Sequence, residues 1–490
     1  MRRLRRLFLT LLLLVLLVFA GIFTVNTIQF SSLQIAVEPV EPAKISYDAI
    51  ERLAAAVRIP TISYEDGLDT AAFLRFDTFL RKNYPLVDSL LERDSTRSFS
   101  HVLKWSGENA RLSPILLLAH TDVVPVENSS QIRWQSPPFD GVVRSDFVWG
   151  RGALDDKSSV CGILEAVEML LQVDYSPQRT VYIAFGHDEE IGGEHGAKAI
   201  AERFRQQNIE FEFVLDEGSL VVEDAFPGLT KPLALIGVAE KGYATFDLSV
   251  NLAEGGHSSM PPSGTAINLL SEALVRLKNN PPPAKIEGTV QAMFEHVGPE
   301  MSLFHKVIFA NLESTAPLVK WQMSQEPAPN AMLRTTLAPT LVSGGFKENV
   351  LPTRASAKVN CRILPGETVA SVANFVRKTI DDERVVVKPS QGSQASEPPV
   401  VSGTATFGYQ VIQATARQIF PKAVAAPSLV VGTTDSRHYQ IVSKNIYRFQ
   451  PVQVKKEDLK RFHGFDERIG VEQFRQAVRF YRQLILNACK

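Results

Sequence analysis

Cysteine is scarce in this chain of 490 residues, which has only Cys161, Cys361 and Cys489. The three lie far apart in the sequence and form no metal-type spacing, which argues against a cysteine-based zinc site. Any metal would therefore need histidine and carboxylate ligands. A strong net charge is also absent, since the formal value is −1. The charge balance gives no reason to expect a polyanionic partner, so we predict no binding to nucleic acid.

Two motifs of common hydrolases are missing as well. No apolar run that could be a strand ends in Gly-x-Ser-x-Gly, the turn that carries the nucleophile of many serine hydrolases. Glu194-His195 is not preceded by the pair that would complete His-Glu-x-x-His, the zinc motif of thermolysin-like proteases. Neither of these two enzyme classes is favoured.

The N-terminus departs most strongly from a soluble composition. Four arginines (Arg2, Arg3, Arg5 and Arg6) precede an apolar run from Leu7 to Val25. At 1.5 Å per residue this run makes a helix about 28 Å long, enough to cross a bilayer. The arginines would keep its first end cytoplasmic, so we expect a membrane-anchored or secreted protein with its catalytic part on the non-cytoplasmic side. We favour an anchor over 1–30. A signal peptide cleaved after Val18-Phe19-Ala20 and a buried helix remain alternatives.

The remainder of the chain alternates between strand-like and helix-like patterns, which predicts an α/β fold with two domains. Residues 31–44 are expected to be a tether, and 45–241 and 392–490 to be two parts of one catalytic domain. Between them, 242–391 is expected to be an inserted α+β domain. Predicted strands are 115–119, 181–185, 211–215, 244–250, 355–363 and 384–388. Predicted helices are 47–57, 158–171, 196–206, 266–277, 369–380 and 471–487.

Histidines and acids follow several predicted strands, at the sheet edge where open α/β sheets bind ligands. The clusters are His120-Thr-Asp122, Asp155-Asp156, His187-Asp-Glu189-Glu190, Asp216-Glu217 and a later His463. Taken singly, each has an ordinary reading: a structural histidine, a helix cap, a solvated turn. Together they supply imidazole and carboxylate groups in one α/β frame, which suits zinc with a position left open for water.

These clusters, in this order, resemble the M20 metallopeptidases and aminoacylases, and most closely the carboxypeptidase S branch and its relatives that act on N-fatty-acyl amino acids. The resemblance runs from about residue 47 to 490. Further motifs that carry it are Gly255-Gly-His257-Ser-Ser, Asn360-Cys-Arg362-Ile-Leu-Pro365-Gly, Gly432-Thr-Thr-Asp435-Ser-Arg437 and His463-Gly-Phe-Asp-Glu467. The Asp155-Asp156 cluster is followed by Lys157. Many members of the family have a glycine after this lysine, whereas this chain has Ser158.

The resemblance implies two zinc ions per subunit. Asp155 would bridge them, His120 and Asp216 would complete one site, and Glu190 and His463 the other. Asp216 is preferred to Glu217, although members differ in which acid of this pair is used.

The resemblance also implies further roles. Asp122 would orient His120, and Glu189 would take a proton from the metal-bridging water and deliver it to the leaving amine. The inserted domain would be a lid and dimerisation domain, so a homodimer is expected. From it His257 would reach the active site, either of its own subunit or of a partner subunit, and stabilise the oxyanion. Asn349, Arg362 and Arg437 would bind a substrate carboxylate or serve structural contacts.

We therefore expect a two-zinc hydrolase that cleaves the amide bond of small peptides or N-acyl amino acids. The same residues would serve a reversible N-acyl amino acid synthase/hydrolase, and sequence does not separate these alternatives. A non-catalytic binding protein on the same scaffold is the third hypothesis, disfavoured because Glu189 and the ligand set are intact.

Overall fold

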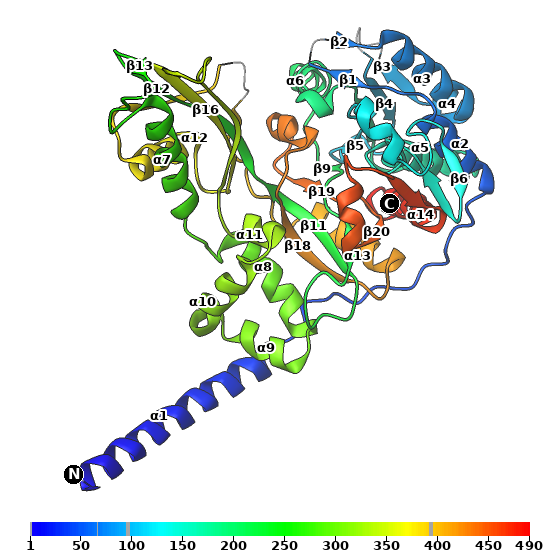
Figure 1. The fold of residues 1–490 in the computed structure, drawn as a ribbon. Coiled ribbons are helices and arrows are strands. Elements are labelled where there is room, and N and C mark those ends of the chain that lie inside the picture. The colour runs from blue at the N-terminus through cyan, green and yellow to red at the C-terminus, as the bar shows by residue number, and fades with distance from the viewer. Residues whose placement is uncertain (1, 66, 95–98, 392–394) are drawn as a thin grey trace.

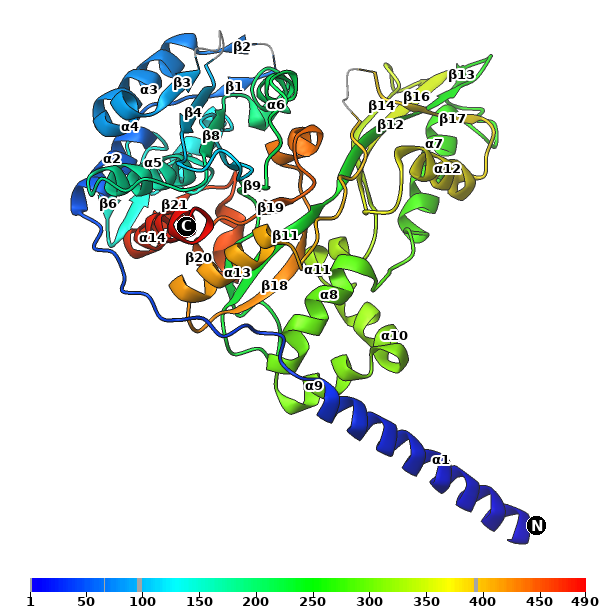
Figure 2. The same cartoon turned by 180° about the vertical axis from the view of Figure 1, so that it is seen from behind.

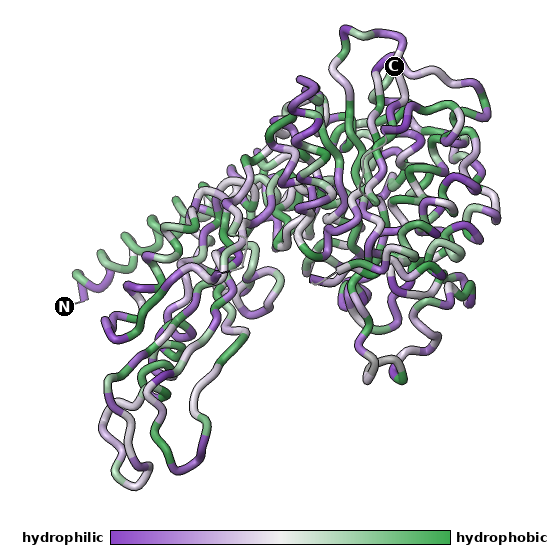
Figure 3. The backbone as a smooth tube through the Cα atoms, turned by 90° about the horizontal axis from the view of Figure 1, so that it is seen from above, coloured by the Kyte–Doolittle hydropathy of each residue, from purple (hydrophilic) through white to green (hydrophobic). Residues whose placement is uncertain are grey.

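The computed structural model describes residues 2–65, 67–94, 99–391 and 395–490. It shows a large lobe, a small lobe and a long N-terminal helix, α1 (Arg2–Gln29), which projects away from both lobes (Figures 1 and 2). Figure 3 shows that α1 is hydrophobic along most of its length. Within the described part of the chain it is the one helix long and apolar enough to cross a membrane.

A ten-stranded sheet runs through the large lobe in the order β20-β10-β11-β19-β9-β5-β8-β4-β3, with β18 beside β11. β8, β5, β9 and β19 are parallel neighbours, so their carboxyl ends meet at one edge of the sheet. The strands are β3 (Glu92–Asp94), β4 (His101–Trp105), β5 (Ile115–His120), β8 (Val181–Gly186), β9 (Phe213–Asp216), β10 (Val221–Glu223), β11 (Leu233–Glu240), β18 (Val424–Val430), β19 (Ile446–Arg448) and β20 (Gln453–Lys455).

Helices cover both faces of this sheet, which explains why its central strands are continuous apolar runs. One face packs on α2, α5, α13 and α14, and the other on α6 and the 3-10 helix η4. All six residues of β5 are buried as a result. These elements are α2 (Tyr47–Val57), α5 (Lys157–Leu171), α6 (Ala197–Gln206), α13 (Phe407–Ile419), η4 (Asp435–Ile441) and α14 (Val471–Ala488).

The small lobe is a four-stranded antiparallel sheet in the order β14-β16-β12-β17. Along β16, buried and more exposed residues alternate, because α7 and α12 cover only one face of the sheet. Thr265 and Thr368 cap these helices by accepting hydrogen bonds from backbone N–H groups. The elements are β12 (Gly242–Asn251), α7 (Ala266–Asn279), β14 (Thr336–Gly344), β16 (Arg354–Ile363), α12 (Val369–Ile380) and β17 (Val385–Pro389).

Four helices between α7 and β14 pack against the large lobe. Their core includes Val290, Phe294 and Leu333 together with Leu233 of β11 and Val424 of β18. They lie at the end of the large lobe from which α1 emerges (Figures 1 and 2). They are α8 (Gly288–Val297), α9 (Leu303–Ala310), α10 (Leu312–Met323) and α11 (Pro327–Leu333).

Short elements complete the fold around these sheets. They are β1 (Ser63–Tyr64), β2 (Gly67–Leu68), α3 (Thr70–Asn83), α4 (Pro85–Leu90), η1 (Asn128–Arg133), β6 (Val142–Arg144), β7 (Phe147–Trp149), η2 (Glu189–Ile191), β13 (Gly256–His257), η3 (Gly298–Glu300), β15 (Val350–Leu351), η5 (Lys456–Arg461) and β21 (Arg468–Gly470).

The α/β class and the two-domain architecture predicted from the sequence are confirmed. The division at residues 241 and 391 stays a prediction. The expected tether makes specific contacts: the Gln34 side chain accepts from the Ala425 N–H at 2.8 Å and donates to the Ala425 carbonyl at 2.9 Å. Arg479 donates to the carbonyl of Ala43 at 2.9 Å. This segment therefore lies along the large lobe.

Candidate metal centre

The predicted ligands lie where parallel strands of the large sheet end. His120 is the last residue of β5 and Asp216 the last of β9, while Glu189 and Glu190 open η2 just after β8. Asp155 lies just before Asp156, the N-cap of α5, and His463 lies in the loop before β21. Parallel pairing brings the ends of β5, β8 and β9 side by side, which is why acids and imidazoles distant in sequence converge here.

Asp155 stands between two imidazoles. Its Oδ1 lies 3.1 Å from Nε2 of His120, and its Oδ2 lies 3.0 Å from Nε2 of His463. The same His463 nitrogen lies 3.2 Å from Oε2 of Glu190. Ligand atoms of His120, Asp155 and Glu190 all fall within 4.8 Å of one another. One carboxylate that offers an oxygen to each of two imidazole-bearing sites has the arrangement of a bridging ligand.

The donor set fits a divalent cation. Glu190 Oε1 is buried and has no hydrogen-bond partner among the described residues, although its neighbours Asp155 and His463 are close. Burial and the charge of Asp155 raise the pKa of Glu190. Hydrogen bonds to Asp155 and Glu190 raise the pKa of His463 to about 10. Burying several acidic groups and imidazoles close together is unfavourable unless a cation balances their charge, and these are groups that zinc binds.

Asp122 organises the residues around this centre. It is fully buried, and its two carboxylate oxygens accept from the backbone N–H groups of Glu189 at 3.2 Å and Glu190 at 3.1 Å. Ser63 donates a further hydrogen bond at 2.6 Å, and Nδ1 of His120 lies 3.3 Å from Oδ1. One carboxylate thus fixes both the imidazole of His120 and the loop that carries the two glutamates.

Glu189 has the environment expected of a general base. Burial raises the pKa of its carboxyl group well above the usual value, and the charges of Glu190 and Asp435 add to this effect. A carboxylate with a raised pKa accepts and returns a proton near neutral pH.

Asp216 and Glu217 occupy different surroundings. Oδ2 of Asp216 accepts from the backbone N–H of Ser436 at 2.8 Å. Burial raises the pKa of Glu217 well above its usual value, and the charges of Asp155 and Asp156 add to the rise. Glu217 therefore lies in the electrostatic field of Asp155, whereas Asp216 accepts a hydrogen bond from the backbone of η4.

Sequence reasoning missed the groups that hold the centre in place. Oε1 of the fully buried Glu467 accepts from the N–H groups of Leu154 at 2.9 Å and Asp155 at 3.1 Å, and Oε2 accepts from Arg151 at 2.5 Å. Gln450 donates to Asp156 at 3.1 Å. The only available signal was position in the sequence, since Glu467 ends the His463 motif and Arg151 lies shortly before Asp155.

The expected substrate-binding residues fall into two groups. Arg362 of β16 donates to Thr433 at 3.4 Å, and Arg437 donates to the Gly192 carbonyl at 2.7 Å, beside the Glu189 loop. Burial lowers the pKa of Arg362, whose guanidinium lies over the ring of Tyr243, 4.9 Å from its centroid. His257 is exposed on β13, and the backbone carbonyl of Asn349 accepts from Ser258 at 3.1 Å. Figure 1 shows β13 at the far end of the small lobe from β5 and β9.

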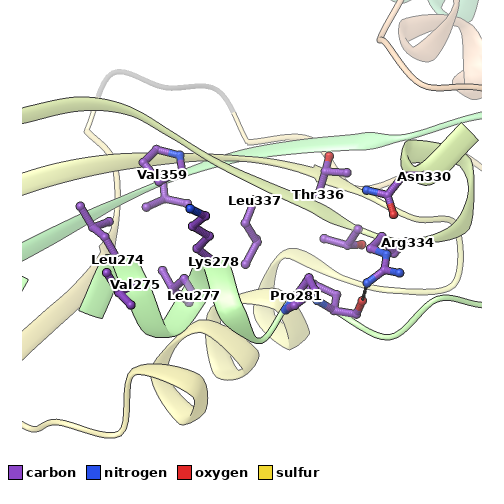
Figure 4. A pocket seen from close by; sticks show the side chains of 13 residues that line it. Leu274, Val275, Leu277, Lys278, Pro281, Asn330, Arg334, Thr336, Leu337 and Val359 are labelled. Atoms are coloured by element: carbon purple, nitrogen blue, oxygen red, sulfur yellow. Dashed lines mark hydrogen bonds between the residues drawn. The ribbon is translucent and has the colours of Figure 1, made fainter. Parts of the chain in front are cut away.

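A cavity of about 390 Å³ lies elsewhere, between α7, β14 and α11 (Figure 4). Its walls are mostly apolar and include Leu274, Leu277, Leu337 and Val359. Val359 and Arg362 are three residues apart on β16 and therefore point to opposite faces of the small sheet. The cavity is thus separate from the metal centre.

The chain matches the model of "Peptidase family M20/M25/M40" over residues 116–487. It is 41% identical to "Probable carboxypeptidase S-like 2" of Dictyostelium discoideum, over 95% of this chain and 91% of that one. It is 42% identical to "N-fatty-acyl-amino acid synthase/hydrolase PM20D1" of Xenopus tropicalis, over 90% and 85%. The fold matches the M20 family metallo-carboxypeptidase Sso-CP2 of Sulfolobus solfataricus with a TM-score of 0.67, at 15% identity and over 90% and 99% of the two chains. This chain is therefore an enzyme of peptidase family M20/M25/M40.

Proposed function

We propose that this enzyme uses two zinc ions to cleave the amide bond of small peptides or N-acyl amino acids. The observation that carries the proposal is the Asp155 carboxylate, which holds one imidazole at each of its oxygens. His120 would bind one ion, together with Asp216 or Glu217, and Glu190 and His463 would bind the other. When bound, the two ions would polarise the scissile carbonyl and make water a stronger nucleophile.

Glu189 performs the proton transfers in this proposal. Its carboxylate accepts a proton from the attacking water and passes it to the leaving amine, for which its raised pKa is suited. Asp122 holds the Glu189 backbone at 3.2 Å and so positions this base against His120.

A substrate with a free carboxylate fits the two arginines near the centre. The relatives are named as a carboxypeptidase and as an N-fatty-acyl-amino acid synthase/hydrolase. The C-terminal residue of a peptide and an N-acyl amino acid both carry a carboxylate beside the amide bond. Arg362 and Arg437 are our candidates to bind it, by the paired N–H groups of a guanidinium.

A partner subunit would complete the site in this proposal. His257 and Asn349 are exposed at the far end of the small lobe, so we propose that they serve the metal centre of a second subunit. Phe346 and Met260 are 82% and 78% exposed in the same region, and a homodimer would cover such apolar side chains.

The reverse reaction, condensing a fatty acid with an amino acid, is the second candidate. It is favoured by the synthase/hydrolase name of relatives such as the one from Xenopus tropicalis. It requires the same residues, so time courses with both substrate sets decide the direction.

We place this chemistry on the non-cytoplasmic side of a membrane. The support is α1, which is long and apolar enough to span a bilayer and follows four arginines.

The test compares wild type with Glu189→Gln on a panel of dipeptides and N-acyl amino acids, with zinc content measured for both. We expect two zincs per chain in each and a fall in kcat of roughly 10²–10⁴-fold in the variant. Glu202→Gln, which alters an exposed ion pair on α6, is the matched control and should be fully active. Absence of zinc from the wild type, or an active Glu189→Gln, would contradict the mechanism.

A second comparison assigns the disputed acid. If Glu217 is the ligand beside His120, Glu217→Gln loses one zinc, while Asp216→Asn retains both. The opposite result restores Asp216 as the ligand.

A further inference from the structure

Exposed apolar residues lie on α9 and α10, the two helices near the point where α1 leaves the folded part of the protein. Leu303 and Phe304, at the start of α9, are 72% and 71% exposed. Leu318 and Trp321 of α10 are 52% and 61% exposed. We call these four residues the α9–α10 patch. Soluble surfaces seldom gather large apolar side chains in this way without a binding partner.

The position of α1 relative to this patch is set by specific contacts. The last turns of α1 pack against α9, and Asn26 donates to Oδ1 of Asn311 at 2.9 Å. Asn311 in turn donates to the Phe23 carbonyl at 3.4 Å. The chain that follows is held to the large lobe through Gln34. The exit of α1 is therefore fixed beside α9 and α10 (Figures 1 and 2).

The apolar run of α1 ends at Val25, between Phe23 and Asn26, the two α1 residues that hydrogen-bond to Asn311. If α1 crosses a bilayer, its surface therefore lies at the level of Asn26 and Asn311, which join α1 to the α9–α10 junction. Ser314, Pro317, Leu318 and Trp321 lie on one side of α10 and carry no charge. Tryptophan with aliphatic neighbours is typical of residues at the interface between lipid headgroups and acyl chains.

We propose that the α9–α10 patch inserts into the bilayer surface as a second membrane contact beside α1. Its occupant is a phosphatidylcholine-type lipid surface. The contact would hold the large lobe at a fixed orientation against the membrane, rather than free at the end of a flexible anchor. This proposal does not depend on the hydrolytic chemistry.

Tryptophan fluorescence tests the proposal directly. The chain has four tryptophans, and Trp105, Trp134 and Trp149 are at most 9% exposed, so Trp321 is the one that lipid can reach. The full chain would be reconstituted into phosphatidylcholine vesicles, either plain or brominated near the top of the acyl chains. We expect the brominated lipid to quench the Trp321 share of the emission, and Trp321→Phe to abolish this quenching.

A pair of variants separates docking from accidental proximity. Phe304→Ser should reduce the quenching of Trp321, because it removes apolar area from the same patch. Leu74→Ser removes another exposed apolar side chain, 60% exposed, from α3 at the opposite end of the large lobe, and should leave the quenching unchanged. Equal emission in plain and brominated vesicles, or failure of the chain to associate with vesicles, would overturn the proposal.

Discussion

Replacement of Glu467 by glutamine should destabilise the enzyme far more than one lost charge on its surface. Glu467 and Arg151 are 0% and 3% exposed and form an ion pair at 2.5 Å, so the variant leaves a buried guanidinium without its counter-charge. Breaking a buried pair in this way costs about 3–5 kcal/mol of unfolding free energy. The glutamine oxygen can still accept from the N–H groups of Leu154 and Asp155, so the loss of unfolding free energy measures the effect of removing the charge.

The assay is urea denaturation at pH 8.5, where Glu467 is ionised, since burial raises its pKa only to about 7. Glu472→Gln is the matched control, because Glu472 is 59% exposed and also pairs with an arginine, Arg479. We expect the control to lose less than about 1 kcal/mol. A loss for Glu467→Gln as small as that of the control would refute the reasoning.

Three further predictions follow from packing, protonation and metal binding. Burial lowers the pKa of His101 to about 4, so as the pH falls this histidine is protonated in the unfolded chain before it is protonated in the folded one. The free energy of unfolding should therefore fall by at most about 3 kcal/mol between pH 6.5 and 4. His101→Gln should flatten this profile of unfolding free energy against pH. Gly408→Ala would place a Cβ 2.7 Å from atoms of Phe213 and Tyr447 and should cost about 1–3 kcal/mol in the same denaturation assay. In Gly432→Ala the added Cβ would have no atom within 4 Å, so this control should not lower the free energy of unfolding. Chelation should abolish activity and lower the melting temperature, with both restored by zinc, because the clustered carboxylates lose the charge that balances them.

Local patterns in the sequence predicted the main elements well. The helices expected at 47–57 and 369–380 have those bounds in α2 and α12. The alternation at 355–363 predicted β16 within one residue, because its pattern reflects a sheet covered on one face. The strand expected at 211–215 is displaced, since β9 spans Phe213–Asp216, and its last residue belongs to the metal-centre edge.

The supporting contacts could not be predicted in the same way. The Glu467 carboxylate binds backbone N–H groups more than 300 residues earlier, and Gln34 binds the backbone of β18 almost 400 residues later. Such hydrogen bonds have no periodicity and use common residue types, so no local pattern marks them. The ligand candidates were recognisable because histidines and acids directly after apolar strands are unusual. Which of Asp216 and Glu217 is the ligand depends on the direction of each side chain, so the sequence pattern does not decide between them.

The arrangement of the metal centre also bears on how the protein is made. Asp155 takes one imidazole from His120 and the other from His463, which lies close to the C-terminus, and α14 follows it to cover the central sheet. During synthesis the small lobe and the first half of the large sheet emerge long before the second imidazole exists. We therefore expect nascent chains, and chains cut short before the last helix, to be wholly inactive. The order of residues along the chain would thus delay hydrolysis until the His463 loop and α14 have been synthesised.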